Sequence, residues 1–229
     1  KTMEPLIGIY EKALPSKIDW LKRLRIAADL GFEFIEISID ESSEKLARLD
    51  WATSQRNNLR RTVEKGKIPI LDLCLSAHRK YALGSADENI RGEALNIFYK
   101  TINFAADIGI RIIQLAGYYV YYEPEDEHSR DRYRAGLEAG LKYAEKMGVM
   151  LALENVDGSH VNSIHRAIQF VHEFNSPWFQ LYPDIGNLTE QGLDVCDELE
   201  MGKGHIVAVH VKDVKKGMVR RISFGEGIV

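Results

Sequence analysis

Short apolar runs of strand length alternate along the chain with longer stretches in which apolar residues recur at a helical period. The sequence predicts strands over residues 5–10, 32–39, 69–77, 110–117, 149–156, 179–186 and 205–211. It predicts helices over residues 18–30, 54–64, 88–107, 129–147, 161–174 and 189–201. Three helices are followed by Gly31, Gly109 and Gly148, and glycine is favoured just after a helix C-terminus. Because alternation of strands and helices produces parallel sheets, we expect an α/β protein.

The number of repeats favours a (β/α)8 barrel, also called a TIM barrel, which typically has about 250 residues. The 229 residues fit one large domain, residues 1–229. An open barrel of seven strands would leave an unpaired apolar edge, which native proteins avoid. We therefore expect that the eighth β/α unit is missing from this chain, which stops at FGEGIV. A doubly wound open sheet is the alternative, although no glycine-rich phosphate loop follows the first strand.

Alternate positions of each predicted strand differ in character. One set is bulky and aliphatic and suits the layer between sheet and helices; it comprises Ile35, Ile37, Leu73, Leu75, Ile113, Leu115, Leu151, Leu153, Val207 and Val209. The other set is small in mid-strand and becomes polar toward the C-terminal end of the strand. Barrel enzymes have their active sites at that end. Since ionisable groups are costly to bury without partners, the pattern favours a functional site.

Three of these polar residues, Glu154, Asp184 and His210, lie at equivalent depth on successive strands. Each alone has an ordinary explanation, namely an ion pair, a brace for the following turn, or a hydrogen-bonded core histidine. Together, two carboxylates and an imidazole would repel or stay poorly solvated unless a cation joined them. This donor set suits Mn²⁺, Co²⁺, Zn²⁺ or Mg²⁺. The sequence therefore predicts one divalent metal ion.

Composition excludes several other classes of protein. A net charge of −4 and a pI of about 6.0 argue against a protein whose main partner is nucleic acid. No apolar run approaches the roughly 20 residues of a membrane span, and no signal peptide is recognisable. Cys74 and Cys196 are interpreted as reduced thiols. We expect a cytoplasmic protein, and exposed apolar helix faces suggest a homo-oligomer.

Several longer strings make the resemblance to known proteins specific. They are GIYEKALP from Gly8, LSAHR from Leu75, IIQLAGY from Ile112, WFQLYPDIGNL from Trp178, HIVAVHVKD from His205 and FGEG from Phe224. In these strings the chain resembles the L-xylulose-5-phosphate (L-ribulose-5-phosphate) 3-epimerases of bacterial L-ascorbate and pentose catabolism. Those enzymes belong to the xylose-isomerase-like TIM-barrel superfamily, and some relatives are named hexulose-6-phosphate isomerases.

The resemblance implies a chemistry and a set of residues. It implies that Glu154, Asp184 and His210 bind the metal, together with a glutamate on the eighth strand that has no counterpart in this sequence. It also implies epimerisation of a small sugar phosphate, L-xylulose 5-phosphate or L-ribulose 5-phosphate, by proton abstraction at C3 through an enediolate. Glu154 would be one of the two acid/base groups.

Further polar residues are candidates for contacts with substrate. We expect hydroxyl contacts from Glu36, His78, Gln114 and Asn187. Phosphate contacts are expected from Lys12, Arg79 and Lys80. Lys212 and Asp213 lie two and three residues after His210 and are expected to polarise the substrate or to support the metal ligands.

Other functions remain open at this point. A hexulose-6-phosphate isomerase, which interconverts an aldose and a ketose, would use the same metal. A barrel that binds sugar phosphates without catalysis is a second alternative. An apurinic-site endonuclease shares the barrel but needs three metals and a DNA-binding face. Asn187 stands where such an enzyme would have another histidine, and the net charge has the wrong sign.

Overall fold

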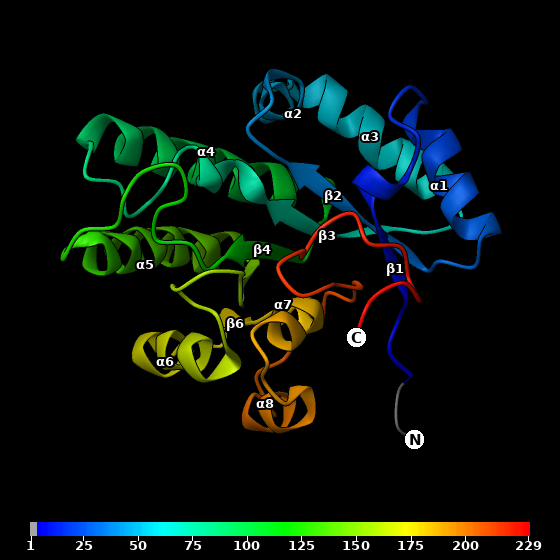
Figure 1. Cartoon of the computed structure of the whole chain (residues 1–229). Helices are drawn as coiled ribbons and strands as arrows, with labels where there is room; N and C mark the ends of the chain where they lie inside the picture. The colour runs from blue at the N-terminus through cyan, green and yellow to red at the C-terminus, as the bar shows by residue number, and fades with distance from the viewer. Residues whose placement is uncertain (1–3) are drawn as a thin grey trace.

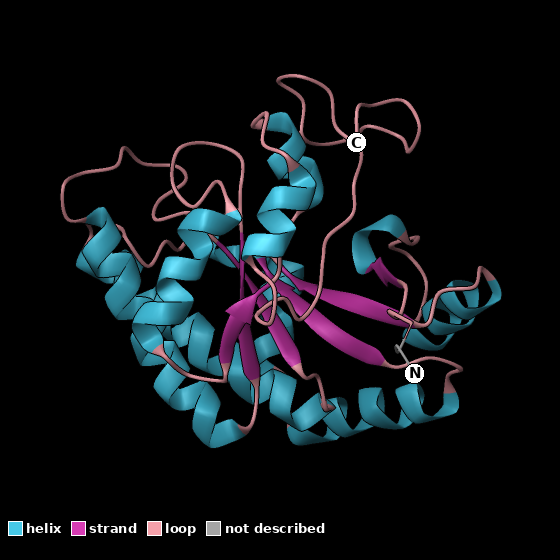
Figure 2. Cartoon of the chain, turned by 90° about the horizontal axis from the view of Figure 1, so that it is seen from below, coloured by secondary structure: helices cyan, strands magenta, loops and turns pink. Residues whose placement is uncertain are grey.

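The centre of the molecule is a parallel sheet of six strands that follow one another in chain order. The structure is a computed structural model that describes residues 4–229. The strands are β1 (Gly8–Tyr10), β2 (Phe34–Ile39), β3 (Ile70–Leu75), β4 (Ile112–Ala116), β5 (Met150–Glu154) and β6 (Phe179–Leu181). Figures 1 and 2 show the helices arranged around the outside of the sheet. This strand order is the one expected for the wall of a (β/α) barrel.

Helices connect the successive strands. They are α1 (Trp20–Asp29), α2 (Ser43–Leu46), α3 (Thr53–Lys65), α4 (Glu88–Ile108), α5 (Ser129–Met147), α6 (Ile164–Phe174), α7 (Ile185–Glu190) and α8 (Val195–Met201). Short 3₁₀ turns occupy Glu11–Ala13, Ala47–Asp50 and Ser76–Arg79. Helix α4 ends at Gly109, whose φ of 88° lies in the left-handed region that favours glycine. Among the residues described, no helix is both long and apolar enough to cross a lipid bilayer.

Two predicted boundaries in the second half of the chain are wrong. The helix expected over residues 189–201 is divided into α7 and α8 by a turn at Gly192, where φ is 75°. Asp194 then caps α8 by accepting a hydrogen bond from the backbone N–H of Asp197 at 3.0 Å. The strand expected over residues 179–186 ends at Leu181, because Asp184 caps the N-terminus of α7.

Residues 205–211, predicted as the seventh strand, run parallel to β6 without forming a continuous ladder. Only isolated bridges occur, between Leu181 and Ile206 and between Asp184 and His210. Pro183 lies opposite this segment and has no N–H to donate, although its carbonyl accepts a bond from the His210 N–H at 2.8 Å. Within residues 4–229, no further strand joins this segment to β1.

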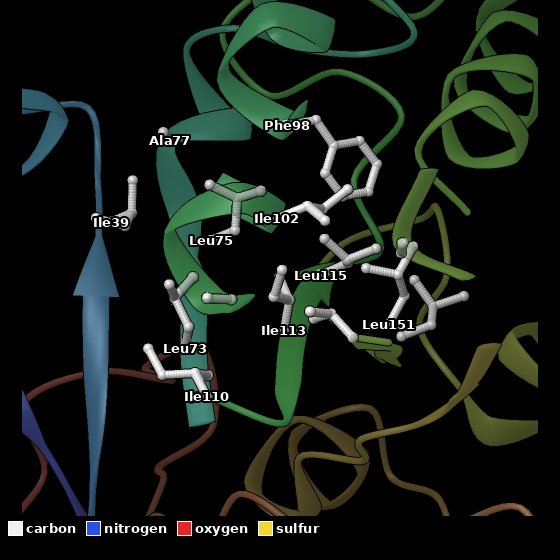
Figure 3. Close-up of a cluster of buried hydrophobic side chains, with 14 of the residues drawn as sticks. Ile39, Leu73, Leu75, Ala77, Phe98, Ile102, Ile110, Ile113, Leu115 and Leu151 are labelled. Carbon is white, nitrogen blue, oxygen red and sulfur yellow. The ribbon is translucent and has the colours of Figure 1, made fainter. Parts of the chain in front are cut away.

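The core lies between the sheet and the helices, as the alternation of side chains predicted. Eight of the ten aliphatic positions, from Ile35 to Leu153, are at most 1% exposed and belong to one cluster. Figure 3 shows Leu75 and Leu115 of the sheet on the side that faces Phe98 and Ile102 of α4. Each fully buried side chain of this size stabilises the fold by about 1.5–3 kcal/mol. The prediction is wrong for Val209, which is 38% exposed because it lies at the edge of the described sheet.

Candidate functional site

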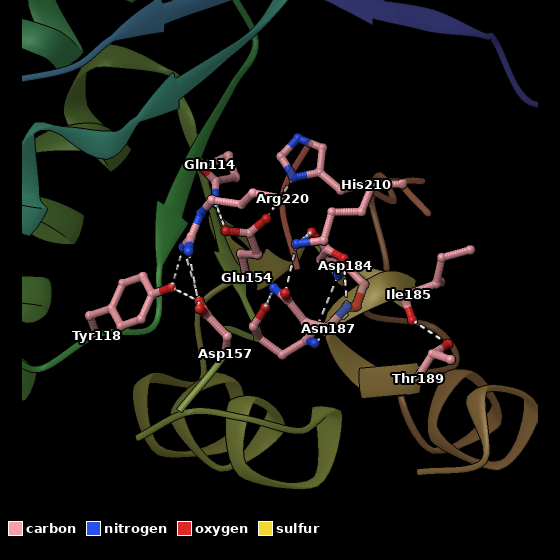
Figure 4. A network of polar contacts seen from close by, with 12 residues as sticks. Gln114, Tyr118, Glu154, Asp157, Asp184, Ile185, Asn187, Thr189, His210 and Arg220 are labelled. Atoms are coloured by element: carbon pink, nitrogen blue, oxygen red, sulfur yellow. Dashed lines mark hydrogen bonds and ion pairs between the residues drawn. The ribbon is translucent and has the colours of Figure 1, made fainter. Parts of the chain in front are cut away.

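The structure brings Glu154, Asp184 and His210 together at the C-terminal end of the sheet. Glu154 is the last residue of β5, Asp184 follows β6, and His210 lies on the neighbouring segment 205–211. One ligand atom from each side chain lies within 4.8 Å of the other two. The carboxylates are buried and the imidazole is partly exposed. Figure 4 shows the three side chains converging.

Carboxylates flank both nitrogens of His210. Nδ1 lies 2.6 Å from Oε1 of Glu154, and Nε2 lies 3.0 Å from Oε2 of Glu36. The Tyr182 ring packs against the imidazole, with 4.6 Å between the ring centroids. Burial alone would lower the pKa of His210, but the carboxylates of Glu36 and Glu154 outweigh it and hold the pKa well above its usual value. The imidazole thus lies between two carboxylates, one at each ring nitrogen.

Asp184 is fixed by its position at the start of α7. Its Oδ1 accepts a hydrogen bond from the backbone N–H of Asn187 at 2.9 Å, and its Oδ2 lies 2.8 Å from Nζ of Lys212. Burial and the nearby Glu154 carboxylate raise the pKa of Asp184, against the effect of Lys212. The backbone of Asp184 is held by the Asn155 carboxamide, through bonds of 2.9 and 3.0 Å. Sequence reasoning missed Asn155, although it directly follows Glu154.

Two residues predicted to contact substrate are hydrogen-bonded to the cluster. Glu36 directs both carboxylate oxygens at Nε2 of His210, at 3.0 and 3.1 Å. Gln114 donates a hydrogen bond from Nε2 to Oε2 of Glu154 at 2.6 Å. The carboxamide oxygen of Gln114 is buried and has no hydrogen-bond partner among the described residues. One acceptor in the lumen thus remains free for a donor group from a ligand.

His78 does not face the cluster, and its predicted contact with substrate is not supported by the geometry. Its Nε2 lies 3.1 Å from the carbonyl oxygen of Ala94, and its ring packs edge-on against Phe98 of α4. The 3₁₀ turn Ser76–Arg79 begins directly after β3 and ends the strand alternation. His78 is therefore turned toward the helix layer.

Replacing His78 by leucine should leave kcat/KM within about threefold and reduce the sensitivity of the fold to acid. Burial lowers the pKa of His78 from 6.5 to about 4, so the unfolded chain binds a proton that the folded protein resists. The free energy of unfolding of the wild type should therefore fall by up to about 3 kcal/mol as the pH drops from 6.5 to 4, and the leucine variant should not show this loss. Urea unfolding between pH 6.5 and pH 4 measures this pH dependence. His128→Leu is the control, because His128 is exposed. A large rise in KM would instead return His78 to the substrate site.

The three residues predicted to contact the phosphate, Lys12, Arg79 and Lys80, line one pocket. Its volume is about 450 Å³, and it is bounded by Lys12, Asp40, Glu41, Ser42, Ser76, Arg79, Lys80 and Tyr122. The Nε atom of Arg79 and the Oγ atom of Ser76 are buried with no hydrogen-bond partner in the described part of the chain. The guanidinium of Arg79 stacks near the rings of Tyr118 and Tyr121, at 5.7 and 5.6 Å. Arg79 and Ser76 thus each keep a polar atom without a partner in the described part of the chain.

Lys212 and Asp213 anchor the segment that follows His210. Lys212 donates to Oδ1 of Asn187 at 2.6 Å, in addition to its ion pair with Asp184. The Asp213 carboxylate accepts backbone bonds from Gly225 at 2.9 Å and Gly227 at 2.8 Å. Asp213 thus organises the loop that carries the FGEG string. Asp213 lies in this loop and not in the cluster.

Arg220, on the same loop, was not singled out by the sequence. It pairs with Asp157 at 3.1 Å and reaches the hydroxyl of Tyr118 at 3.3 Å (Figure 4). Tyr118 also donates a hydrogen bond to Asp157. These contacts fasten the loop to the segments that follow β4 and β5, and no sequence pattern identified them because they join residues far apart in the chain.

The cluster fits a divalent cation. Two carboxylates and an imidazole nitrogen within 4.8 Å form a mixed oxygen and nitrogen donor set, typical of Zn²⁺ and Mn²⁺ sites. Burial, and after it the neighbouring Glu154 carboxylate, raises the pKa of Asp184 and so disfavours its ionised form. A cation held by Glu154, Asp184 and His210 would stabilise both carboxylates in their ionised forms.

Comparison with known proteins identifies the class of this barrel. The family described as xylose isomerase-like TIM barrel matches residues 24–229. Among solved structures, a D-psicose 3-epimerase superposes with a TM-score of 0.81 at 16% identity, over 98% of this chain and 77% of that one. An L-ribulose 3-epimerase gives 0.78 at 20% identity, over 99% and 74%. The predicted TIM-barrel fold is confirmed.

Curated relatives narrow the assignment. The chain is 50% identical to the L-ribulose-5-phosphate 3-epimerase UlaE of Shigella flexneri and 51% identical to that of Salmonella paratyphi A. Each match covers 97% of this chain and 78% of the relative. The chain therefore belongs to the L-ribulose-5-phosphate 3-epimerase family, whose members are isomerases, as the sequence strings predicted.

Proposed function

We propose that this protein is a metal-dependent 3-epimerase that interconverts L-xylulose 5-phosphate and L-ribulose 5-phosphate. The observation that carries the proposal is the convergence of Glu154, Asp184 and His210 within 4.8 Å in a chain half identical to named 3-epimerases. Glu36 and Gln114, which contact these residues, keep two of the three in fixed orientations. A cytoplasmic location and a role in L-ascorbate degradation belong to the same proposal.

The reaction requires that a proton leave C3 of the ketose and that a proton return on the opposite face. Glu154 is the acid/base group on one face, and Gln114 holds its carboxylate at a fixed angle through the 2.6 Å hydrogen bond. A bound divalent cation would supply several kcal/mol of electrostatic stabilisation to the enediolate. The family resemblance assigns the second acid/base group to a glutamate on an eighth strand.

Substrate orientation falls to residues around the cluster. Asn187 and Lys212 are hydrogen-bonded to each other beside Asp184, and we assign them to the sugar hydroxyls. Arg79, with Lys12 and Lys80, is assigned to the phosphate. Lys12 is already paired with Asp40 at 2.6 Å, whereas Arg79 has no acidic partner among the described residues. Arg79 is therefore the stronger phosphate partner of the two.

The proposal is tested by following L-ribulose 5-phosphate in D₂O by NMR, with the full-length protein stripped of metal and then given Mn²⁺. Product formation is read after removal of the paramagnetic ion. Metal-dependent deuterium incorporation at C3, with formation of L-xylulose 5-phosphate, is the expected result. Exchange at C1 would point to the alternative, an aldose–ketose isomerase. No exchange at either carbon, with metal bound, would eliminate both and leave a binding protein.

Replacing Arg79 by alanine should raise KM for L-ribulose 5-phosphate about 10–100-fold with a smaller change in kcat. Hydrogen bonds to charged groups contribute about 1.5–3 kcal/mol each, and a lysine at this position would keep the charge without the planar fork. Steady-state kinetics measure the effect, with Lys67→Ala as the control because Lys67 is exposed, pairs with Asp29 and does not line the pocket. Equal losses with unphosphorylated L-ribulose would show that Arg79 does not bind the phosphate.

A further inference from the structure

Glu36 is a buried carboxylate whose only bonded partner among the described residues is a histidine. It lies on β2, 3% exposed, and both of its oxygens approach Nε2 of His210, at 3.1 and 3.0 Å. No lysine or arginine within residues 4–229 pairs with it. Burying a carboxylate without such a partner is costly, so this arrangement requires a compensating contact.

The contact joins opposite sides of the barrel wall. Glu36 is flanked in the sheet by Tyr10 of β1 and Asp72 of β3, whereas His210 lies beyond β6. The two residues are 174 positions apart in the chain. The Glu36 carboxylate therefore reaches across the lumen to meet the imidazole.

The two nitrogens of the imidazole face different partners. Nδ1 faces Glu154 at 2.6 Å, on the side of the proposed metal ligands, and Nε2 faces Glu36. A neutral imidazole that binds a cation through one nitrogen carries its proton on the other. Histidine ligands in metal sites commonly donate this second N–H to a carboxylate, which fixes the tautomer and the ring orientation.

We infer that Glu36 is a positioning residue that holds His210 as a metal ligand through Nδ1, and that it does not bind a substrate hydroxyl. This inference rests on the proposed function, because it requires a cation at Glu154, Asp184 and His210. It replaces the expectation from sequence, since both oxygens of Glu36 are already directed at the imidazole. The Tyr182 ring, 4.6 Å from the imidazole, restrains the ring from another side.

The inference predicts a graded loss of metal affinity. Mutation of a carboxylate behind a metal-bound histidine typically costs 10–100-fold in affinity, and we expect this range for Glu36→Ala. Glu36→Gln should lose less, because its amide oxygen still accepts the Nε2–H bond. Competition with a chelator measures the Zn²⁺ and Mn²⁺ affinities of the full-length protein. Thermal unfolding of the metal-free variants confirms that each one is folded.

A matched control comes from the adjacent strand. Asp72 is directly opposite Glu36 in the sheet, is also 3% exposed, and accepts a hydrogen bond from Tyr182 at 3.1 Å without touching His210. Asp72→Asn keeps an acceptor for Tyr182 and should change metal affinity by no more than about threefold, well below the 10–100-fold loss expected at a positioning carboxylate.

NMR of the His210 ring distinguishes a role of Glu36 in orienting the imidazole from a general loss of protein stability. In the Zn²⁺-loaded protein, ¹⁵N NMR of the His210 ring should show a protonated Nε2 and a metal-bound Nδ1. In Glu36→Ala, the Nε2 proton should exchange faster with water, and in Glu36→Gln it should be partly protected. The opposite tautomer in the wild type would overturn the inference.

The outcomes also distinguish this inference from the proposed function. If the wild type binds neither metal, both fall. If it binds metal and Glu36→Ala binds equally well, only the positioning role is overturned. If Glu36→Gln loses as much affinity as Glu154→Gln, Glu36 is itself a ligand and the inference is wrong. A graded loss with the expected tautomer supports it.

Discussion

Replacing Glu154 by glutamine is expected to eliminate measurable deuterium exchange at C3 and to lower kcat by about 10²–10⁴-fold, the usual contribution of a general acid or base. The amide keeps the size of the side chain but cannot accept the proton. The same substitution removes an oxygen donor from the cluster of three ligands. Exchange should therefore be measured at saturating Mn²⁺, so that weaker metal binding does not account for the loss.

Glu198 provides a control for this substitution. It is buried to a similar degree, at 7% against 8% exposure, and accepts a hydrogen bond from the backbone N–H of Ile164 at 2.6 Å, away from the lumen. Glu198→Gln keeps an acceptor oxygen and should retain exchange at C3. If Glu154→Gln also retained it with metal bound, Glu154 would not be the base.

Replacing Glu11 by glutamine should destabilise the fold by about 3–5 kcal/mol at pH 7, the usual cost of breaking a buried ion pair. The Glu11 carboxylate is 3% exposed and lies at 2.5–2.7 Å from nitrogens of Arg23, Lys45 and Arg48. Without the negative charge, three cations remain close together in the interior. Urea unfolding at pH 7 measures the loss.

The effect of Glu11 should depend on pH in a defined direction. Burial alone would raise its pKa, but Arg48 and Lys45 outweigh burial and lower it from 4.5 to about 2. That difference corresponds to about 3 kcal/mol, fully present above pH 4.5 and lost as the pH falls toward 2. The difference in stability between the wild type and Glu11→Gln should therefore shrink as the pH falls from 4.5 toward 2.

An exposed ion pair is the control that tests whether the loss of stability in Glu11→Gln depends on burial of the charges. Glu200 pairs with Lys203 on the surface, where both side chains are at least 70% exposed. Glu200→Gln should leave the free energy of unfolding unchanged within error, because exposed ion pairs contribute little. A Glu11→Gln variant as stable as this control would show that the three cations find other partners.

The alternation of side chains along the strands predicted some features of the site and not others. Strand alternation located Glu154 and His210 at the C-terminal end of the sheet, and the distinctive strings located the chain in its family. The same alternation does not extend to His78. The strand predicted over residues 69–77 ends at Leu75, and the 3₁₀ turn Ser76–Arg79 turns His78 toward the helix layer. The alternation also failed after Leu181, because Asp184 satisfies the N-terminus of α7 and ends the strand.

The sequence by itself determined the order of the elements, the aliphatic face of each strand and the donor set of the cluster. These depend on residues near one another in the chain and on the period of two along a strand. Only the tertiary structure decided that Glu36 contacts His210, that Gln114 donates a hydrogen bond to Glu154 and that Glu11 pairs with three cationic side chains. The period of a strand says which side of the sheet a residue faces, but the partner it meets depends on how the sheet curves around the lumen.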